Sequence, residues 1–332
     1  MVDIVAPTSP GRKGQKPSLI GTGFQHELAY FGPALMSKTT DFGQTWSTPR
    51  VMVGLASLDQ TIANQIVIDR QSGALYDFFN LIQNFSNAGG HRGYSVAYVK
   101  STDGGATWTK PSVIAALDTA GVSDPNNLSP LTNAPPAPSR TGDIIPEPAI
   151  NPTTGQLYVV WQDARFNNFS NDEVVISTSD DGGTSWSAPQ RVNDHTGQPA
   201  YDPSVYVNSA GVVGVSYFQW ATTSSGNEPT TLFIRHSTSP GTSTAGPAFD
   251  AASPVDGPFN NLAAPVSRGY FLGDYQGLVA NGSGFIPFYV KTNCADGGPA
   301  QPTCRAIQSV LDPTDQTPTG NNATGVYAAP GS

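Results

Sequence analysis

Short apolar runs recur along the chain, separated by clusters of Gly, Pro, Asn, Asp and Ser. The runs at 157–161, 212–218 and 285–290 are rich in Val, Tyr and Phe. Runs of about four to eight residues with this composition and these borders are typical of β-strands joined by turns. No apolar run approaches the ~20 residues that a membrane-spanning helix needs. The pattern therefore predicts an all-β chain.

Tight turns join the first two strands of the predicted units. Each turn opens with Asn or Asp and closes with Gly, at 69–73, 151–155, 208–211 and 281–284. This chemistry strongly favours hairpins. The strands around these turns group into five four-stranded units, of which the first is compressed. Four-stranded units repeated radially are the blades of a β-propeller, so we predict a propeller with five blades counted and six possible.

One short pattern, Ser/Thr-x-Asp-x-Gly-x-Ser/Thr-Trp, occurs three times, at 39–46, 101–108 and 179–186. Asp can accept hydrogen bonds from the amides of a turn, Gly supplies a positive φ, and Trp can pack between strands. An acid repeated in every unit is best explained as maintaining that unit. We therefore assign a structural role to the three Asp and three Trp residues: Asp41, Trp46, Asp103, Trp108, Asp181 and Trp186.

Composition agrees with a folded β-protein. The 332 residues include 35 Gly and 29 Pro, and Pro alone costs roughly 3 kcal/mol inside a helix. Hydrophobic residues make up 38% and charged residues 12%, which is too apolar for a disordered chain. The net charge is −9, whereas a protein that binds a phosphate backbone needs a basic face. We expect a monomer that has neither nucleic acid nor a membrane as a partner.

The chain has two cysteines, Cys294 and Cys304, on either side of a short Gly/Pro-rich loop. They favour one local disulfide, and two free thiols are the alternative. Few Lys residues, many Ser, Thr, Asn, Gly and Pro residues and this Cys pair indicate an extracytoplasmic, secreted protein. The first residues lack the apolar core of a signal peptide, and we expect that such a leader has been removed.

The three repeats resemble the Asp-box turns of the bacterial-neuraminidase-repeat, or sialidase-like, propellers. The sequences VVWQDARF (159–166) and LGDYQGL (272–278) also resemble secreted sialidase-like proteins. The resemblance covers about 16–311, which we take as the propeller domain, between an N-terminal extension (1–15) and a tail (312–332) that is available to close a blade. Asp boxes also occur in proteins that hydrolyse no sialoside, so the resemblance implies the fold more strongly than the activity.

Blade geometry places the starts of the first strands around the central axis, on the face opposite the repeats. That ring holds Glu147, Asp202 and Asp274, with Tyr275 beside them. Carboxylates gathered around a narrow opening raise one another's pKa, as a general acid requires. A glycosidase needs such an acid and a second carboxylate or a Tyr nucleophile. We predict these four residues as catalytic; the alternative is that the acids only bond exposed amides at the strand starts.

Arginines gather on the same face, and sialidases hold the substrate carboxylate with three of them. The resemblance implies substrate-binding roles for Arg92, Arg140, Arg165 and Arg268, although the Arg-Ile-Pro motif of the family is absent. Trp220 and Phe166 are predicted as exposed aromatics for sugar stacking. The four His residues are too scattered for a zinc site, so we predict no metal and no cofactor.

These observations favour a secreted, sialidase-like glycoside hydrolase that acts on terminal, acidic sugars of glycans. One alternative is a non-catalytic propeller that binds a glycan or a protein. Another is a hydrolase or lyase that acts on a different polysaccharide.

Overall fold

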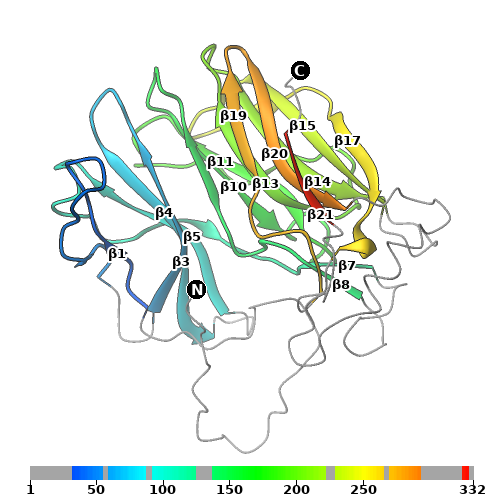
Figure 1. The fold of residues 1–332 in the computed structure, drawn as a ribbon, viewed down its shortest axis with the longest axis horizontal. Coiled ribbons are helices and arrows are strands. Elements are labelled where there is room, and N and C mark those ends of the chain that lie inside the picture. The colour runs from blue at the N-terminus through cyan, green and yellow to red at the C-terminus, as the bar shows by residue number, and fades with distance from the viewer. Residues whose placement is uncertain are drawn as a thin grey trace, which may run out of the picture.

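A computed structural model describes the backbone of residues 32–54, 59–86, 92–124, 137–221, 229–264, 269–292 and 324–328. These residues form β-strands and turns, and among them the helical element is a single 3₁₀ turn, η2 (Asn261–Ala263). The strands are arranged in several mostly antiparallel sheets (Figure 1). The all-β class predicted from the sequence is confirmed.

Two sheets are four-stranded meanders of the predicted kind, in which each strand pairs with the next. The first contains β3 (Asp59–Ile68), β4 (Leu75–Ser86), β5 (Arg92–Ser101) and β6 (Ser112–Ala116). The second contains β9 (Glu147–Ile150), β10 (Leu157–Asp163), β11 (Glu173–Ser179) and β12 (Gln190–Arg191).

Two further sheets follow along the chain. One contains β13 (Ala200–Val207), β14 (Val213–Trp220) and β15 (Pro229–Ser239), and β15 pairs with both β16 (Ala248–Phe249) and β17 (Ser253–Asn260). The other contains β19 (Gly277–Asn281), β20 (Gly284–Thr292) and β21 (Thr324–Ala328).

Two small sheets complete the described structure. β1 (Leu35–Met36) pairs with β2 (Arg50–Val51). β8 (Ala137–Arg140) pairs with β7 (Val122–Asp124) and, in parallel, with β18 (Tyr270–Phe271).

The predicted hairpins join the first two strands of the four larger sheets. Gly73, Gly155 and Gly211 have positive φ values of 73°, 75° and 81°, and their N–H groups bond back to the carbonyl of the opening Asp or Asn. In the last hairpin the positive φ belongs to Gly282 rather than to the closing Gly284. Contacts join β3 to β9, β9 to β13 and β13 to β19, so the first strands follow one another through the molecule. The described part of the chain shows no closed ring, and the blade number stays a prediction.

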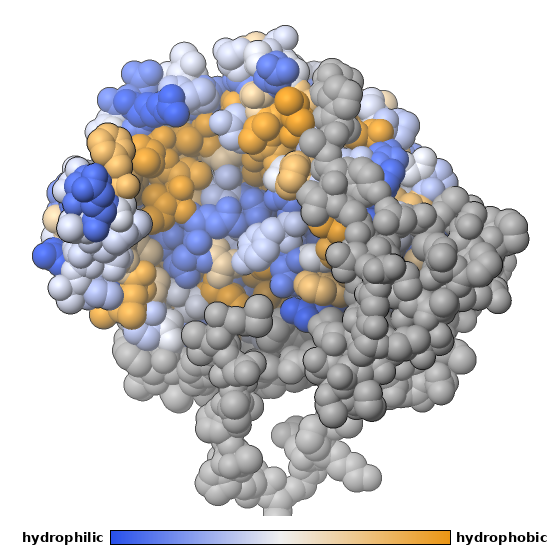
Figure 2. Space-filling view, viewed as in Figure 1, coloured by the Kyte–Doolittle hydropathy of each residue, from blue (hydrophilic) through white to orange (hydrophobic). Residues whose placement is uncertain are grey.

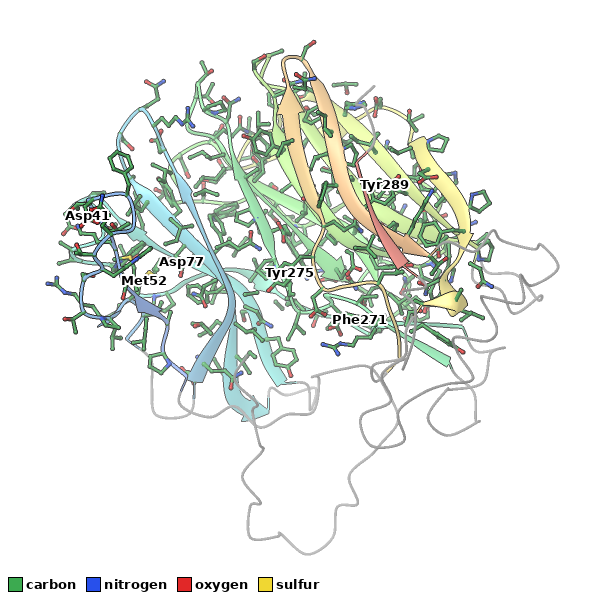
Figure 3. All side chains as sticks on the ribbon, in the orientation of Figure 1. Asp41, Met52, Asp77, Phe271, Tyr275 and Tyr289 are labelled. Atoms are coloured by element: carbon green, nitrogen blue, oxygen red, sulfur yellow. The ribbon has the colours of Figure 1, made fainter. Side chains whose placement is uncertain are left out.

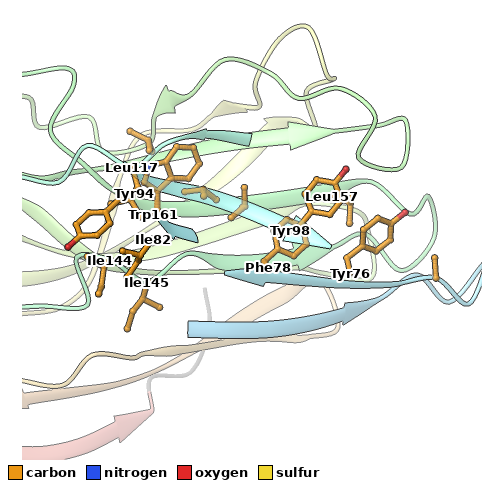
Figure 4. Packing of buried hydrophobic residues seen from close by; sticks show 14 residues of the cluster. Tyr76, Phe78, Ile82, Tyr94, Tyr98, Leu117, Ile144, Ile145, Leu157 and Trp161 are labelled. Atoms are coloured by element: carbon orange, nitrogen blue, oxygen red, sulfur yellow. The ribbon is translucent and has the colours of Figure 1, made fainter. Parts of the chain in front are cut away.

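The hydrophobic core lies between consecutive sheets. Phe78 and Tyr98 of the first meander pack with Leu157, Val159 and Trp161 of the second (Figure 4). A second cluster joins the β9–β12 sheet to the β13–β15 strands. Each central sheet therefore buries both of its faces, and β10, β11 and β14 are buried along their whole length.

The three repeated sequences form the same closed turn. In each, one Asp oxygen accepts the N–H of the Ser or Thr four residues on (2.9 to 3.0 Å), and the other accepts its hydroxyl (2.5 Å). These hydrogen bonds hold the pKa of Asp41 and Asp181 down at about 2 and lower that of Asp103. The acids serve the turns, as their repetition suggests.

Each of the later turns packs on the preceding sheet. The Tyr98 hydroxyl donates to the carbonyl of Gly183 (2.5 Å), and the Lys100 ammonium donates to that of Gly182 (3.3 Å). Lys38, which occupies the position before the first turn, donates in the same way to Gly104 of the second turn (3.3 Å). The repeats therefore join neighbouring sheets as well as closing their own hairpins.

The three tryptophans are not equivalent. Trp186 packs edge-on to Phe78, with ring centroids 5.8 Å apart, and Trp108 is half-buried against the cluster around Phe79. Trp46 is 63% exposed. We expected every repeat tryptophan to pack between strands. In the described part of the chain this is wrong for Trp46, whose side chain is mostly exposed.

We expect alanine substitutions to rank accordingly. Replacing a fully buried Trp with Ala lowers the free energy of unfolding by about 3–5 kcal/mol. The half-buried Trp108 should therefore contribute less, about 2 kcal/mol, and Trp186 somewhat more than Trp108. Trp46→Ala should lower the free energy of unfolding by less than about 0.5 kcal/mol, because Trp46 is exposed. Urea denaturation of the three variants measures this, and an equal loss in all three would contradict the described burial.

Candidate active site

Two of the first strands, β3 and β13, carry a β-bulge near the end where the carboxylates were predicted. The register of β13 against β14 shifts between Tyr201 and Ser204, and that of β3 against β4 shifts between Ile62 and Gln65. The bulges place Asp202 (φ 45°) and Ala63 (φ 60°) in the left-handed region. A residue other than Gly held there is strained, and such strain concentrates at functional sites.

The predicted acids Glu147, Asp202 and Asp274 come together at this end. Burial raises the pKa of Glu147 to about 7, although Gln65 donates to its Oε1 atom (3.0 Å). Burial also raises the pKa of Asp202 well above its usual value, and the charges of Asp274 and Glu147 act in the same direction. Burial raises the pKa of Asp274, against the lowering effect of Arg140.

Two further buried carboxylates extend this group. Burial and the charge of Asp172 raise the pKa of Asp143 to about 8, and burial raises that of Asp172 to about 6. The Thr119 hydroxyl lies 2.6 Å from Asp172 Oδ2 and 3.4 Å from Asp143 Oδ2. Sequence reasoning missed both acids because they lie in connecting segments that have no periodic pattern.

An exposed phenol lies beside the buried acids. Tyr275 is 57% exposed, and its pKa is raised by partial burial and by the charges of Asp274 and Glu147. The Arg140 guanidinium lies 3.5 Å from Asp274 Oδ2 and 4.2 Å from the centre of the Phe271 ring. In Figure 3, Tyr275 lies near the middle of the molecule, with Phe271 below it. The same view in space-filling form shows a hydrophilic band across this hollowed centre, between apolar walls (Figure 2).

A cavity of about 670 Å³ lies at the other end of the same inner strands. Its lining includes Ile68, Ile150, Tyr206 and Ala280 and no carboxylate. The carboxyl groups therefore gather at the strand starts rather than in this cavity, and we place the candidate chemistry at the strand starts.

Two other predicted site residues, Arg165 and Trp220, are already engaged by neighbouring protein groups. Arg165 forms a two-pronged pair with Asp163, with Nε–Oδ1 at 2.7 Å and Nη2–Oδ2 at 2.6 Å, and also donates to the Ala116 carbonyl. Trp220 is 1% exposed in a cluster with Tyr201 and Phe218. The prediction that Trp220 is an exposed stacking surface is wrong, because β14 is buried on both faces. Phe166 is exposed, as expected.

Some predictions fall outside the described residues. These are Arg268, Cys294 and Cys304, together with the side chain of Arg92, whose backbone belongs to β5. Among the described residues, no group of three or more His, Cys, Asp or Glu side chains is arranged to hold a metal ion. No helix in the same set is long and apolar enough to cross a membrane.

No family model matches the sequence, and the search of curated proteins found no match. Solved structures do resemble the chain. A protein of unknown function from Dyadobacter fermentans shares 18% identity over 83% of this chain and 69% of its own, with a TM-score of 0.43. The Hadza microbial sialidase Hz136 shares 12% over 69% of this chain and 42% of its own, with a TM-score of 0.43. A Penicillium chrysogenum α-L-arabinanase shares 18% identity over 78% of this chain and 67% of its own, with a TM-score of 0.43.

The arrangement provides the parts of an acid–base centre. A carboxyl whose pKa is about 7, as for Glu147, can both hold and release a proton at neutral pH. The raised pKa of Tyr275 means that its phenol needs a base before it can attack. Asp274 remains half-buried beside Arg140 and can face a bound molecule.

Proposed function

We propose that the centre around Glu147, Tyr275 and Asp274 is the active site of a glycoside hydrolase that acts on terminal sugars of glycans. The observation that carries the proposal is an exposed phenol, Tyr275, within the electrostatic reach of two carboxyls of raised pKa. A carboxyl pair, or a Tyr with a carboxylate partner, is what hydrolysis at an anomeric carbon requires.

In this mechanism the Tyr275 oxygen attacks the anomeric carbon while Glu147 takes the phenolic proton. The bond between that carbon and the leaving oxygen breaks, and Asp274 donates a proton to the leaving oxygen. Water then attacks the anomeric carbon and gives a proton to Asp274, while the bond between that carbon and the Tyr275 oxygen breaks and Glu147 returns the proton to that oxygen. The configuration at the anomeric carbon is retained.

The finer proposal is that the terminal sugar is acidic, as in sialosides. Arg140 is the predicted arginine that lies at this centre in the described structure, and a guanidinium pairs well with a carboxylate. It already faces Asp274, so a carboxylate on the sugar would have to compete with that pair. Secretion and a monomeric state are likewise proposals that follow from the sequence.

A panel of fluorogenic glycosides tests the proposal, with a sialoside, a glucuronide, an arabinofuranoside and a galactoside as members. We expect at least one to be cleaved, and Tyr275→Phe to lower its kcat by at least about 10². A fluorinated inactivator of the cleaved sugar should leave a sugar adduct on Tyr275 in peptide mass spectrometry. Tyr206→Phe, an exposed Tyr at the far end of β13, is the control and should keep full activity.

Cleavage of the sialoside or glucuronide alone would support the acidic-sugar proposal. Glycan binding without turnover in the wild type would instead indicate the non-catalytic binding module. An adduct on a carboxylate would overturn the role of Tyr275.

A further inference from the structure

Gln162 makes a set of buried bonds that the proposed mechanism does not use. It lies on β10 and is fully buried. Its Nε2 atom donates to Thr141 Oγ1 (2.9 Å) and to Asp172 Oδ2 (3.0 Å). Its Oε1 atom accepts the N–H of Asp202 (2.9 Å). One amide therefore joins three segments that carry acids of the site.

The bond to Asp202 acts on the strained bulge. Asp202 holds a φ of 45°, which costs free energy unless the surroundings fix it. Gln162 holds the N–H of this residue, and the N–H of Gly142 holds its carboxylate at 2.7 Å. Two bonds from different segments thus fix Asp202 in its unusual conformation.

The bond to Thr141 closes a circuit. Thr141 precedes Gly142, so the path runs from Gln162 to Thr141, along the backbone to Gly142, across to Asp202 and back to Gln162. A Cβ atom at Gly142 would lie 2.4 Å from the Asp274 carbonyl oxygen, so the Asp274 backbone rests directly against this circuit. Arg140 lies at one end of the same loop and Glu147 begins the next strand.

We propose that Gln162 is a positioning residue of the site, which sets the placement of Asp274, Arg140 and Glu147 through Asp202 and the 141–142 loop. The proposal rests on the proposed function only for its kinetic consequence. Its structural part, the placement of the carboxyls, stands independently of which reaction they perform.

The chain offers a matched control in Gln156. This residue is also buried and directly precedes β10. Its side chain also makes three hydrogen bonds, since its Nε2 atom donates to Thr178 Oγ1, Pro240 O and Gly241 O (3.0 to 3.2 Å). Those acceptors lie at the hairpin end of the sheets, away from the acids. Gln156→Met and Gln162→Met therefore remove similar bonding from opposite ends of one strand.

The test compares the two variants. We expect similar losses of thermal stability in both, but a fall in kcat of about 10- to 100-fold only in Gln162→Met, with KM within about threefold. Carboxyl ¹³C NMR titration supplies a readout that needs no turnover. The pKa of Glu147 or Asp274 should move by at least about 0.5 unit in Gln162→Met and stay unchanged in Gln156→Met.

If Gln162→Met does not fold, Thr141→Val tests the proposal in its place, because this substitution removes only the hydroxyl to which Gln162 donates. The same changes, smaller in size, are then expected. Equal kinetic and titration behaviour of the Gln162 or Thr141 variant and the Gln156 variant would overturn the proposal. If the wild type cleaves no glycoside, the proposed function fails, while the NMR titration still decides the positioning role.

Discussion

Replacing Glu147 with Gln is expected to abolish most turnover of any glycoside that the wild type cleaves, lowering kcat by about 10²–10⁴-fold. The carboxyl of Glu147 has a pKa of about 7 and is the proposed base for Tyr275. An amide has the same shape and cannot take the proton. Gln65 can still donate to the new side chain, so the local packing should survive.

The control is Glu173→Gln. Glu173 is likewise fully buried, but it lies at the start of β11, where its Oε1 atom is 3.7 Å from Arg191 and accepts from Asn193 (3.3 Å). This substitution should lower the melting temperature and leave kcat unchanged. A Glu147→Gln variant that melts early and keeps its activity would show that Glu147 serves the fold and not the reaction.

Turn chemistry explains why much of the fold could be predicted. Asn or Asp followed by Gly at a fixed offset leaves the backbone few choices, and the hairpins at 69–73, 151–155 and 208–211 form as expected. The repeat acids such as Asp103 are satisfied within their own turns by neighbours in sequence. Local bonding of this kind is visible in a sequence because all its partners are a few residues apart.

Burial by neighbouring sheets could not be predicted in the same way. The sequence of β14 ends in Trp220, and an aromatic at a strand end looks available for stacking. The strand is instead covered on both faces, because sheets pack on either side of it. Arg165 was likewise predicted for the substrate, but Asp163, two residues before it, takes its guanidinium.

The candidate site divides along the same line. Glu147, Asp202 and Asp274 could be predicted because each lies at or near the start of a first strand (β9, β13 and β19), which is a local feature. Asp143, Asp172 and Gln162 were missed because their roles depend on bonds between segments 20 to 60 residues apart, such as Gln162 to Asp202 and Thr119 to Asp172. A buried polar residue within an apolar strand, as at Gln162, was the one signal that could have suggested them.

The buried acids predict an unusual dependence of stability on pH. In the folded protein the pKa is about 8 for Asp143, about 7 for Asp77 and Glu147, and about 6 for Asp172, because each is buried. In the unfolded chain these groups titrate near pH 4. Between these values the folded state binds more protons than the unfolded state, so the free energy of unfolding falls as pH rises.

The repeat turns act in the opposite direction at lower pH. Asp41 and Asp181 have folded pKa values of about 2, so their contribution is present above pH 4 and is lost as pH falls toward 2. The two effects together place the maximum of stability near pH 4 and predict a decline toward pH 8. The pH of maximum stability is therefore lower than in most proteins, whose stability is highest between about pH 5 and 8.

Asp143→Asn tests this profile, with urea denaturation measured at intervals from pH 3 to pH 8. Asparagine has no proton to lose, so the decline between pH 5 and pH 8 should become shallower, and each pKa unit removed corresponds to about 1.4 kcal/mol. The free energy of unfolding of the variant should therefore increase relative to that of the wild type as pH rises. Asp181→Asn is the counterpart, since it should flatten only the limb below pH 4. A wild-type stability that rises steadily from pH 5 to pH 8 would contradict the burial of these acids as neutral groups.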